Sequence, residues 1–312
     1  MDKAKSPKVS VIIPTYNRAS LIPRAIESVL AQNYNGIEII IVDDGSTDNT
    51  KEVINKLKDK KIKYIQHKEN MGGAAARNTG IKMAKAEYIA FLDSDDEWFP
   101  KKLETQIKVF NDMNDDTGVV YSAFWKIHEG CKSYKPNKII KKKEGWIHEE
   151  LLNGNFVTLQ AALLKKDCFS KAGLFDVSIQ RLHDWELWLR ISRYFKFKFI
   201  DEPLVNVYYT PISISTNHNA LIESSKKILR KHFSEFSKNK KILSKRYFYI
   251  GKFMAEAHDT KNGKKYFKKA IKANPLNMQA YLLFLNSLLG GKLYTSNYRI
   301  LKFLKSKVRN IQ

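Results

Sequence analysis

The stretch "KVSVIIPTYNRASLIPRAIESVLAQ", from Lys8 to Gln32, decides the fold class. Its first seven residues form a nearly continuous apolar run, which is typical of a strand buried on both faces of a parallel sheet. Apolar residues then recur at helical spacing at Leu21, Ala25 and Val29, which indicates a helix with one buried face. A buried strand followed directly by such a helix predicts the first half of a βαβ unit.

The same alternation continues along the chain. "IEIIIV" (37–42) predicts a second buried strand, "TKEVINKLKD" (50–59) a helix and "IKYIQH" (62–67) a short strand. A glycine-rich loop then leads into a helix in residues 70–86, and a fourth strand ends in "LDSDD" (92–96). After about residue 100 the alternation becomes irregular, with further strands expected in 118–128, 158–166 and 197–210 and a helix in 183–195. This pattern predicts an α/β fold with a mostly parallel central sheet.

The charge is concentrated in the last third of the chain. The 312 residues carry a net charge of +23, but residues 216–312 hold 22 Lys/Arg against 4 Asp/Glu, whereas residues 1–215 hold 33 against 28. From about residue 218 the pattern is helical throughout. We therefore expect a nearly neutral α/β domain in 1–217 and a basic, all-helical region in 218–312.

The helical region has a weak repeat. Tyr247, Gly251, Phe267 and Pro275 lie near the spacing of a tetratricopeptide helical hairpin. The final stretch, "KLYTSNYRILKFLKSKVRN" (292–310), is a basic amphipathic helix by pattern. It could pack on the preceding helices or bind an anionic membrane surface, and the polycationic composition favours the membrane.

Several protein classes are excluded by composition and motifs. No stretch approaches the roughly 20 apolar residues of a membrane span, and the first ten residues lack the apolar core of a secretory signal. Cys131 and Cys168 are too few for a disulfide framework or a zinc site. Neither a P-loop nor a dinucleotide fingerprint occurs. These features predict a cytoplasmic protein.

Polar residues follow three of the predicted strands. The first strand ends in "PTYNR", the second in "DDGS" and the fourth in "DSDD". Ligands of open α/β sheets bind beyond the carboxyl ends of the strands, so these residues should share one site. Carboxylates packed together repel one another, so a positive group should lie among them. Arg18, Arg77 or a divalent cation such as Mg²⁺ or Mn²⁺ could serve.

The sequence resembles the family 2 glycosyltransferases, which have the GT-A fold. Five blocks in order carry the resemblance, over roughly residues 8–210: "VSVIIPTYNRASLIPRAIESVLAQ", "IIIVDDGSTDNT", "NMGGAAARNTGI", "YIAFLDSDD" and "FDVSIQRLHDWELWLR". The resemblance implies a GT-A domain, with a mostly parallel, Rossmann-like sheet, that binds a nucleotide-sugar donor and a divalent metal, Mn or Mg.

The resemblance also implies roles for individual residues. "DSD" matches the family's DxD motif, in which Asp95 would ligate the metal and Asp93 would bind the ribose. Asp184 matches the family's catalytic base, although His183 stands where the family usually has an acidic residue. The residues expected to bind the donor nucleotide are Pro14, Thr15, Tyr16, Asp44, Arg77 and Asp93. Further contacts with donor or acceptor are expected from Gly73, His183, Trp185 and His218. For Gly73 the alternative is a role in backbone conformation, and for Trp185 it is packing in the core.

Three functions remain open from the sequence. The first is an inverting, metal-dependent transfer of sugar from a nucleotide diphosphate, expected to be a UDP-sugar, to a glycan or lipid-linked acceptor in surface polysaccharide synthesis. The second is a sugar nucleotidyltransferase. The third is a nucleic-acid or scaffold protein acting through the basic tail, which leaves the carboxylates unexplained. The first predicts a peripheral protein at the inner face of the cell membrane, with no nucleic-acid partner.

Overall fold

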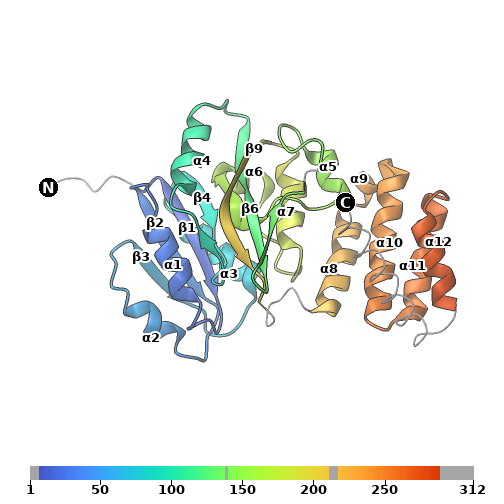
Figure 1. Ribbon diagram of the computed structural model, residues 1–312, viewed down its shortest axis with the longest axis horizontal. Helices are drawn as coiled ribbons and strands as arrows, with labels where there is room; N and C mark the ends of the chain where they lie inside the picture. The colour runs from blue at the N-terminus through green and yellow to red at the C-terminus, as the bar shows by residue number, and fades with distance from the viewer. Residues whose placement is uncertain (1–6, 138–139, 211–216, 289–312) are drawn as a thin grey trace. The chain divides into compact units, whose positions relative to one another are not determined.

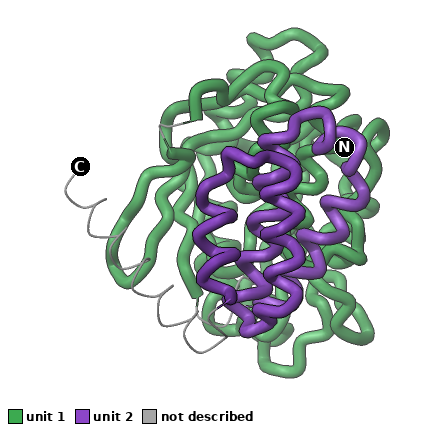
Figure 2. The backbone as a smooth tube through the Cα atoms, turned by 90° about the vertical axis from the view of Figure 1, so that its right-hand side faces the viewer, with its two compact units in different colours: residues 1–213 green, residues 214–312 purple. Residues whose placement is uncertain are grey.

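The computed structural model describes residues 7–137, 140–210 and 217–288. The chain divides into two compact units, residues 1–213 and 214–312, which are coloured separately in Figure 2. The expected final helix in 292–310 lies outside the described residues. Among the described residues, no helix combines the length and the apolar character needed to cross a membrane.

The first unit is built on a mixed nine-stranded sheet (Figure 1), in the order β3-β2-β1-β4-β8-β6-β9-β5, with β7 paired to β6. Parallel pairing joins β1 to β2 and β4, β2 to β3, and β6 to β9. The other pairings, which involve β5, β7 and β8, are antiparallel. The strands are β1 (Val9–Thr15), β2 (Ile37–Asp43), β3 (Ile62–Gln66), β4 (Tyr88–Phe91), β5 (Glu97–Trp98), β6 (Thr117–His128), β7 (Cys131–Lys135), β8 (Ala162–Lys165) and β9 (Lys196–Tyr208).

Helices cover both faces of this sheet, as the apolar strands require. Alternate residues of β1, among them Val9 and Val11, join one core together with residues of α1 and α4. Ile12 faces the opposite side, where it lies against Gly80 of α3. The helices of this unit are α1 (Ile22–Leu30), α2 (Thr50–Asn55), α3 (Gly73–Met83), α4 (Lys102–Asn111), α5 (His148–Asn153), the 3-10 turn η1 (Leu159–Ala161), α6 (Asp167–Ala172) and α7 (His183–Ile191).

The second unit consists of helices throughout its described part, as the sequence predicts. Phe248, Phe267 and Ala280 belong to its core, and Gly251 lets α10 approach α11 because a Cβ atom there would lie 2.9 Å from the Phe267 ring. The tetratricopeptide-like repeat stays a prediction. The helices are α8 (His218–Lys231), α9 (Phe233–Lys238), α10 (Lys240–Glu256), α11 (Thr260–Ala273) and α12 (Met278–Leu288).

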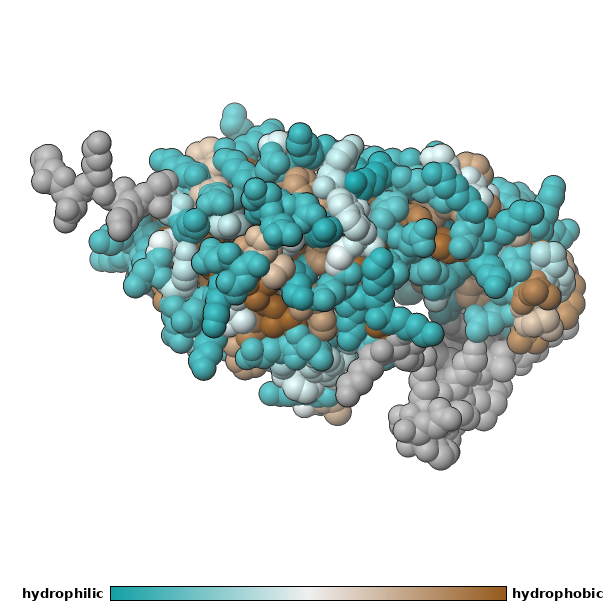
Figure 3. Space-filling model, turned by 90° about the horizontal axis from the view of Figure 1, so that it is seen from above, coloured by the Kyte–Doolittle hydropathy of each residue, from teal (hydrophilic) through white to brown (hydrophobic). Residues whose placement is uncertain are grey.

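The described surface is mainly hydrophilic on the face that Figure 3 shows. Hydrophobic side chains gather at α12, where Met278, Leu282, Leu285 and Leu288 are each more than half exposed. This hydrophobic surface directly precedes the residues beyond 288, which lie outside the described part of the chain.

Candidate active site

The site lies where the carboxyl ends of β1, β2 and β4 meet. β1 is the point at which the strand order reverses, since β2 lies on one side of it and β4 on the other. Thr15 pairs with Asp43 in register, and the Thr15 carbonyl accepts from the backbone N–H of Asp44 at 2.8 Å. Crevices at such reversals are where open α/β sheets bind ligands. The three polar strand ends are therefore brought together as the sequence predicts.

The end of β1 offers both a buried and an exposed side chain to this crevice. Thr15 is buried and its Oγ1 atom has no hydrogen-bond partner within the described residues. Tyr16 is 43% exposed, and Pro14, which precedes both residues, is partly buried. A buried hydroxyl without a partner is unfavourable unless a ligand completes its hydrogen bonding.

Asp44 makes structural hydrogen bonds that the sequence did not predict. Its buried carboxylate accepts from the backbone N–H groups of Met71 at 3.0 Å and Gly72 at 2.7 Å, and its Oδ1 atom lies 2.7 Å from Nδ1 of His67. These contacts tie the end of β2 to the loop that precedes α3. The expected contact between Asp44 and a nucleotide base stays a prediction.

The carboxylates of "DSDD" form a cluster directly after β4. One oxygen of each of Asp93, Asp95 and Asp96 lies within 4.8 Å of the others. Burial, and then the charge of Asp93, raises the pKa of Asp95. Burial, followed by the charges of Asp93 and Asp95, raises the pKa of Asp96 well above the ordinary value. Burial and mutual repulsion therefore both disfavour the ionised forms of these carboxylates.

Neighbouring elements fix the positions of the last two carboxylates. Thr210 donates to Asp95 at 2.7 Å, and the backbone N–H of Tyr208 donates to Asp96 at 2.9 Å. Arg24 of α1 donates to the backbone carbonyl of Asp95. Asp96 thus joins the end of β9 to the cluster, which agrees with a structural task for that carboxylate.

Arg77 of α3 links the carboxylate cluster to α7. Its buried guanidinium donates to Asp93 and, through Nη1, to the Gly73 carbonyl at 3.1 Å, and Nη1 lies 3.2 Å from Nε2 of His183. A Cβ atom at Gly73 would lie 2.9 Å from that same Nη1 atom. Gly73 therefore leaves room for the arginine, and its expected contact with the donor stays a prediction.

Asp184 and His183 lie at the start of α7. Asp184 accepts from the amide of Asn155 at 2.7 Å. Burial raises the pKa of Asp184, although the backbone N–H of Trp185, the Asn155 amide and Arg77 act in the opposite direction. Burial, reinforced by Arg77, lowers the pKa of His183 to about 3. Asp184 is thus a somewhat stronger base than an exposed aspartate, and His183 is a neutral imidazole near neutral pH.

Two further residues, Trp185 and His218, were expected to contact the donor or the acceptor. Trp185 is 5% exposed and its indole donates to the Leu151 carbonyl at 2.7 Å, which favours the packing role. His218 is exposed and begins α8 in the second unit. Contacts of either residue with a donor or an acceptor stay predictions.

Three residues of the site carry no sequence signal that singles them out. Gln160 of η1 donates to Asp93, Asn155 donates to Asp184, and Arg24 holds the backbone at Asp95. Gln160 and Asn155 come from the irregular connection between α5 and β8. No periodicity or motif marks such positions, because tertiary folding alone brings them to the site.

Comparison with known proteins agrees with this geometry. The family model described as glycosyl transferase family 2 matches residues 10–173, more than half of the chain. An uncharacterised glycosyltransferase of Rickettsia prowazekii is 37% identical over 203 residues, which cover 64% of this chain and 63% of that protein. The chain thus spans less than two thirds of the length of this relative. The Escherichia coli UDP-Glc:alpha-D-GlcNAc-diphosphoundecaprenol beta-1,3-glucosyltransferase WfaP is 52% identical over 99 residues, 32% of this chain and 39% of WfaP.

Solved structures share the fold. Staphylococcus aureus TarS, residues 1–349, in complex with UDP-GlcNAc has a TM-score of 0.61 at 17% identity, covering 93% of this chain and 92% of that one. The same TarS fragment in complex with UDP has a TM-score of 0.58 at 19% identity, covering 94% and 91%. The expected GT-A architecture, a mostly parallel sheet followed by C-terminal helices, is confirmed. By its matched sequence, its fold and its aspartate cluster, the chain belongs to glycosyl transferase family 2.

Proposed function

We propose that the protein is a metal-dependent, inverting glycosyltransferase that moves a sugar from a nucleotide diphosphate, specifically a UDP-sugar, to a lipid-linked or glycan acceptor. Its family favours glycosyl transfer over the sugar nucleotidyl transfer that the sequence left open. The printed activity of WfaP, a UDP-Glc donor and a diphosphoundecaprenol-linked acceptor, supports this donor and acceptor class. Such acceptors lie at membranes, which supports work at the inner membrane face in surface polysaccharide synthesis.

One observation carries the proposal: the carboxylate cluster and a separate carboxylate lie on two sides of one arginine. Arg77 donates to Asp93 of the cluster and lies 3.2 Å from His183, the residue next to Asp184. A donor diphosphate needs cations, whereas an acceptor hydroxyl needs a base. In the proposed site, the aspartate cluster would hold the cation and Asp184 would be the base.

The cluster fits a divalent metal. Its donors are hard carboxylate oxygens, which Mg²⁺ and Mn²⁺ prefer. Burial, and then the charges of neighbouring aspartates, raises the pKa values of Asp95 and Asp96, and a bound cation would favour their ionised forms. Asp95, with Asp93 beside it, would hold the ion. When bound, the ion would stabilise the negative charge of the leaving diphosphate.

The protein's own residues perform the remaining steps. Thr15, Tyr16 and Asp44 would hold the base of the nucleotide at the ends of β1 and β2. Asp184 would accept the proton of the acceptor hydroxyl as that oxygen attacks the anomeric carbon from the face opposite the diphosphate. The C–O bond to the diphosphate breaks in the same displacement, so the anomeric configuration inverts.

Replacement of the proposed base tests this assignment. Asp184→Asn should keep the contact with Asn155 but lower the transfer rate by about 10²–10⁴-fold, with donor affinity nearly unchanged. Calorimetric titration with UDP measures donor binding, and product formation measures transfer. Asp112→Asn, an exposed aspartate at the end of α4, is the matched control. Transfer by Asp184→Asn at a rate near that of the parent would refute the base assignment.

A screen of nucleotide sugars, each with Mn²⁺ and with EDTA, tests the donor and the metal. We expect slow hydrolysis of at least one UDP-sugar that EDTA abolishes and added Mn²⁺ restores. Hydrolysis that is indifferent to EDTA would contradict the metal assignment and leave the family unaffected. Release of pyrophosphate from a sugar phosphate and a nucleoside triphosphate would instead indicate nucleotidyl transfer.

A further inference from the structure

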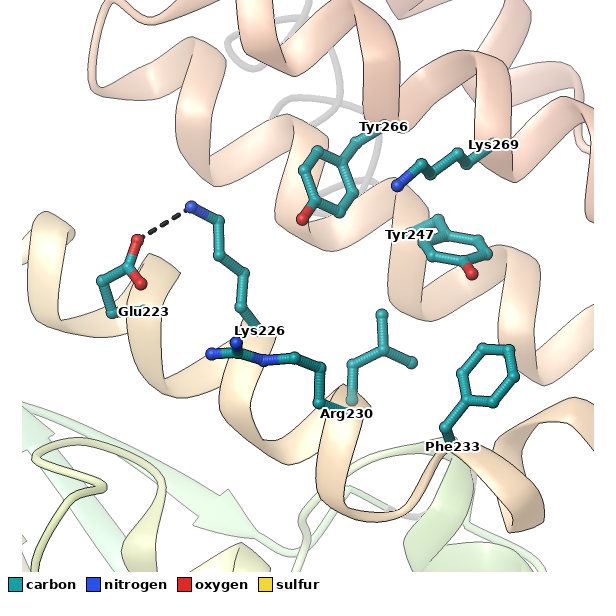
Figure 4. Close-up of a pocket in the computed structure, with 8 residues that line it drawn as sticks. Glu223, Lys226, Arg230, Phe233, Tyr247, Tyr266 and Lys269 are labelled. Atoms are coloured by element: carbon teal, nitrogen blue, oxygen red, sulfur yellow. Dashed lines mark hydrogen bonds and ion pairs between the residues drawn. The ribbon is translucent and has the colours of Figure 1, made fainter.

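The second unit has a cavity of its own, of about 590 Å³. Four helices line it, and Figure 4 shows their side chains around one space. Lys226 and Arg230 come from α8 and Lys269 from α11, whereas the aromatic lining residues are Phe233, Tyr247 and Tyr266. The volume lies within the range of small-molecule sites, roughly 300–1,000 Å³.

The cations of this cavity are poorly neutralised. Within the described residues, the Arg230 side chain makes no hydrogen bond or ion pair, and the Lys269 ammonium group lies over the rings of Tyr266, at 5.0 Å, and Tyr247, at 5.8 Å. Lys226 pairs with Glu223 at 2.8 Å, the single acidic lining residue. That pair is partly exposed, and such pairs contribute little to stability, so Lys226 can exchange its partner for a ligand. Three cations against one carboxylate favour an anion.

The rest of the lining favours an organic group beside that anion. Phe233 is 47% exposed and lines the cavity, and Leu229 adds an aliphatic side chain to the lining. Tyr247 and Tyr266 face the cavity from α10 and α11 with ring centroids 6.2 Å apart. Aromatic faces bind rings and chains of low polarity, and free inorganic phosphate would leave them unused.

We propose that this cavity binds a phosphate ester. The arginine and the two lysines hold the phosphate, because a guanidinium matches its oxygens with paired donors and lysine adds point charges. The aromatic side chains hold the organic part. The phosphate could belong to a phospholipid headgroup or to a soluble sugar phosphate, and the two sources share this chemistry. The site lies in a different unit from the catalytic residues and does not depend on the proposed reaction.

Reversal of one charge, with a matched control, tests the site in the full chain. Arg230→Glu removes the proposed phosphate ligand, and Lys241→Glu makes the same change in charge at an exposed residue of α10 that does not line the cavity. With phenyl phosphate as the probe in calorimetric titration, Arg230→Glu should weaken binding at least about tenfold, and Lys241→Glu about twofold or less. Phe233→Ala should weaken binding of phenyl phosphate but not of inorganic phosphate.

Two further probes identify the source of the phosphate. Binding of glucose 1-phosphate that depends on Arg230 indicates a soluble ester. Binding to phosphatidylglycerol vesicles, but not to phosphatidylcholine vesicles, with the same dependence indicates a lipid. Circular dichroism spectra and unchanged UDP-sugar hydrolysis check that the variants fold. The proposal is wrong if the parent binds none of these probes, or if Arg230→Glu and Lys241→Glu weaken binding equally.

Discussion

Arg77 organises the active site at the scale of single residues. It is the buried cation that touches Asp93, and through His183 it reaches the helix that carries Asp184. Burial, and then the charges of the neighbouring aspartates, raises the pKa values of Asp95 and Asp96, and Arg18 and Arg24 offset this only in part. A divalent cation held by Asp95, as proposed, would offset this repulsion, and carboxylate oxygens are ligands that suit such a cation.

The pKa values of Asp184 and His183 predict the pH dependence of transfer. Asp184 accepts a proton only when ionised, so the rate should fall as pH decreases through its pKa, which burial raises above that of an exposed aspartate. His183, with a pKa of about 3, stays neutral near neutral pH, so its titration should not contribute to this fall in rate.

The check is the pH–rate profile of His183→Gln, whose amide oxygen can still accept from Arg77. The midpoint of the acid limb of this variant should stay within about half a pH unit of the parent's midpoint. A midpoint displaced by a whole unit or more would assign the limb to His183. Asp184→Glu should move the midpoint, because the carboxylate is displaced relative to Asn155.

At the scale of elements, the contact between α3 and β1 positions the arginine. Gly80 lies against Ile12, and a Cβ atom there would approach Ile12 Cγ2 to 2.4 Å. Arg77 lies one turn before Gly80 on the same helix, so the distance between α3 and the sheet sets the depth at which the guanidinium reaches Asp93. Gly80, which has no side chain, thus helps to position Arg77 at the proposed donor site.

Gly80→Ala should force α3 away from the sheet. We expect a loss of about 1–3 kcal/mol in the free energy of unfolding, measured with urea, because inserted methyl groups strain a close-packed core. Affinity for UDP should fall as well. Ile12→Ala alone should be destabilising through the cavity it leaves, but in the double variant the two losses should be smaller than their sum. Strictly additive losses would show that the predicted clash is relieved in another way.

The elements that the sequence predicts are those with long, regular patterns. The β-branched run ending at Pro14 is long enough to identify β1, and the regular apolar spacing from Leu21 onward identifies α1. β5 has two residues and α5 has six, too few for a periodicity to show. The polar residues after β1, β2 and β4 could be expected at one site because they follow strand ends, whereas the role expected of Asp184 came from the family resemblance. Gln160 lies on the three-residue turn η1 and Asn155 in the loop before it, and only their tertiary contacts bring them to Asp93 and Asp184.

At the scale of the whole molecule, the charge divides along the same line as the structure. Residues 216–312 hold 22 of the 55 Lys/Arg residues but only 4 of the 32 Asp/Glu residues, and the compact units divide between residues 213 and 214. A catalytic unit that is nearly neutral does not need a polycation for its own stability. An anionic surface attracts such a segment by about 1 kcal/mol per Lys or Arg close to it, which gives the second unit a use if the acceptor is lipid-linked.

The proposed membrane contact predicts that charges near the C-terminus matter more than equal charges elsewhere. Reversing Lys302, Lys305 and Lys307 to Glu should weaken binding to phosphatidylglycerol vesicles by roughly two orders of magnitude at low salt. The matched control reverses Lys51, Lys56 and Lys60, which are exposed on or beside α2 of the first unit, and should change binding only a few-fold. Co-sedimentation with vesicles measures both, and binding of the parent should weaken as salt is added because exposed charges are screened.

If the two triple variants lose binding equally, the net charge of the chain and not its C-terminal segment drives the attraction. UDP-sugar hydrolysis without acceptor should be the same in all three proteins, because this contact concerns where the enzyme works and not the displacement that Asp184 assists.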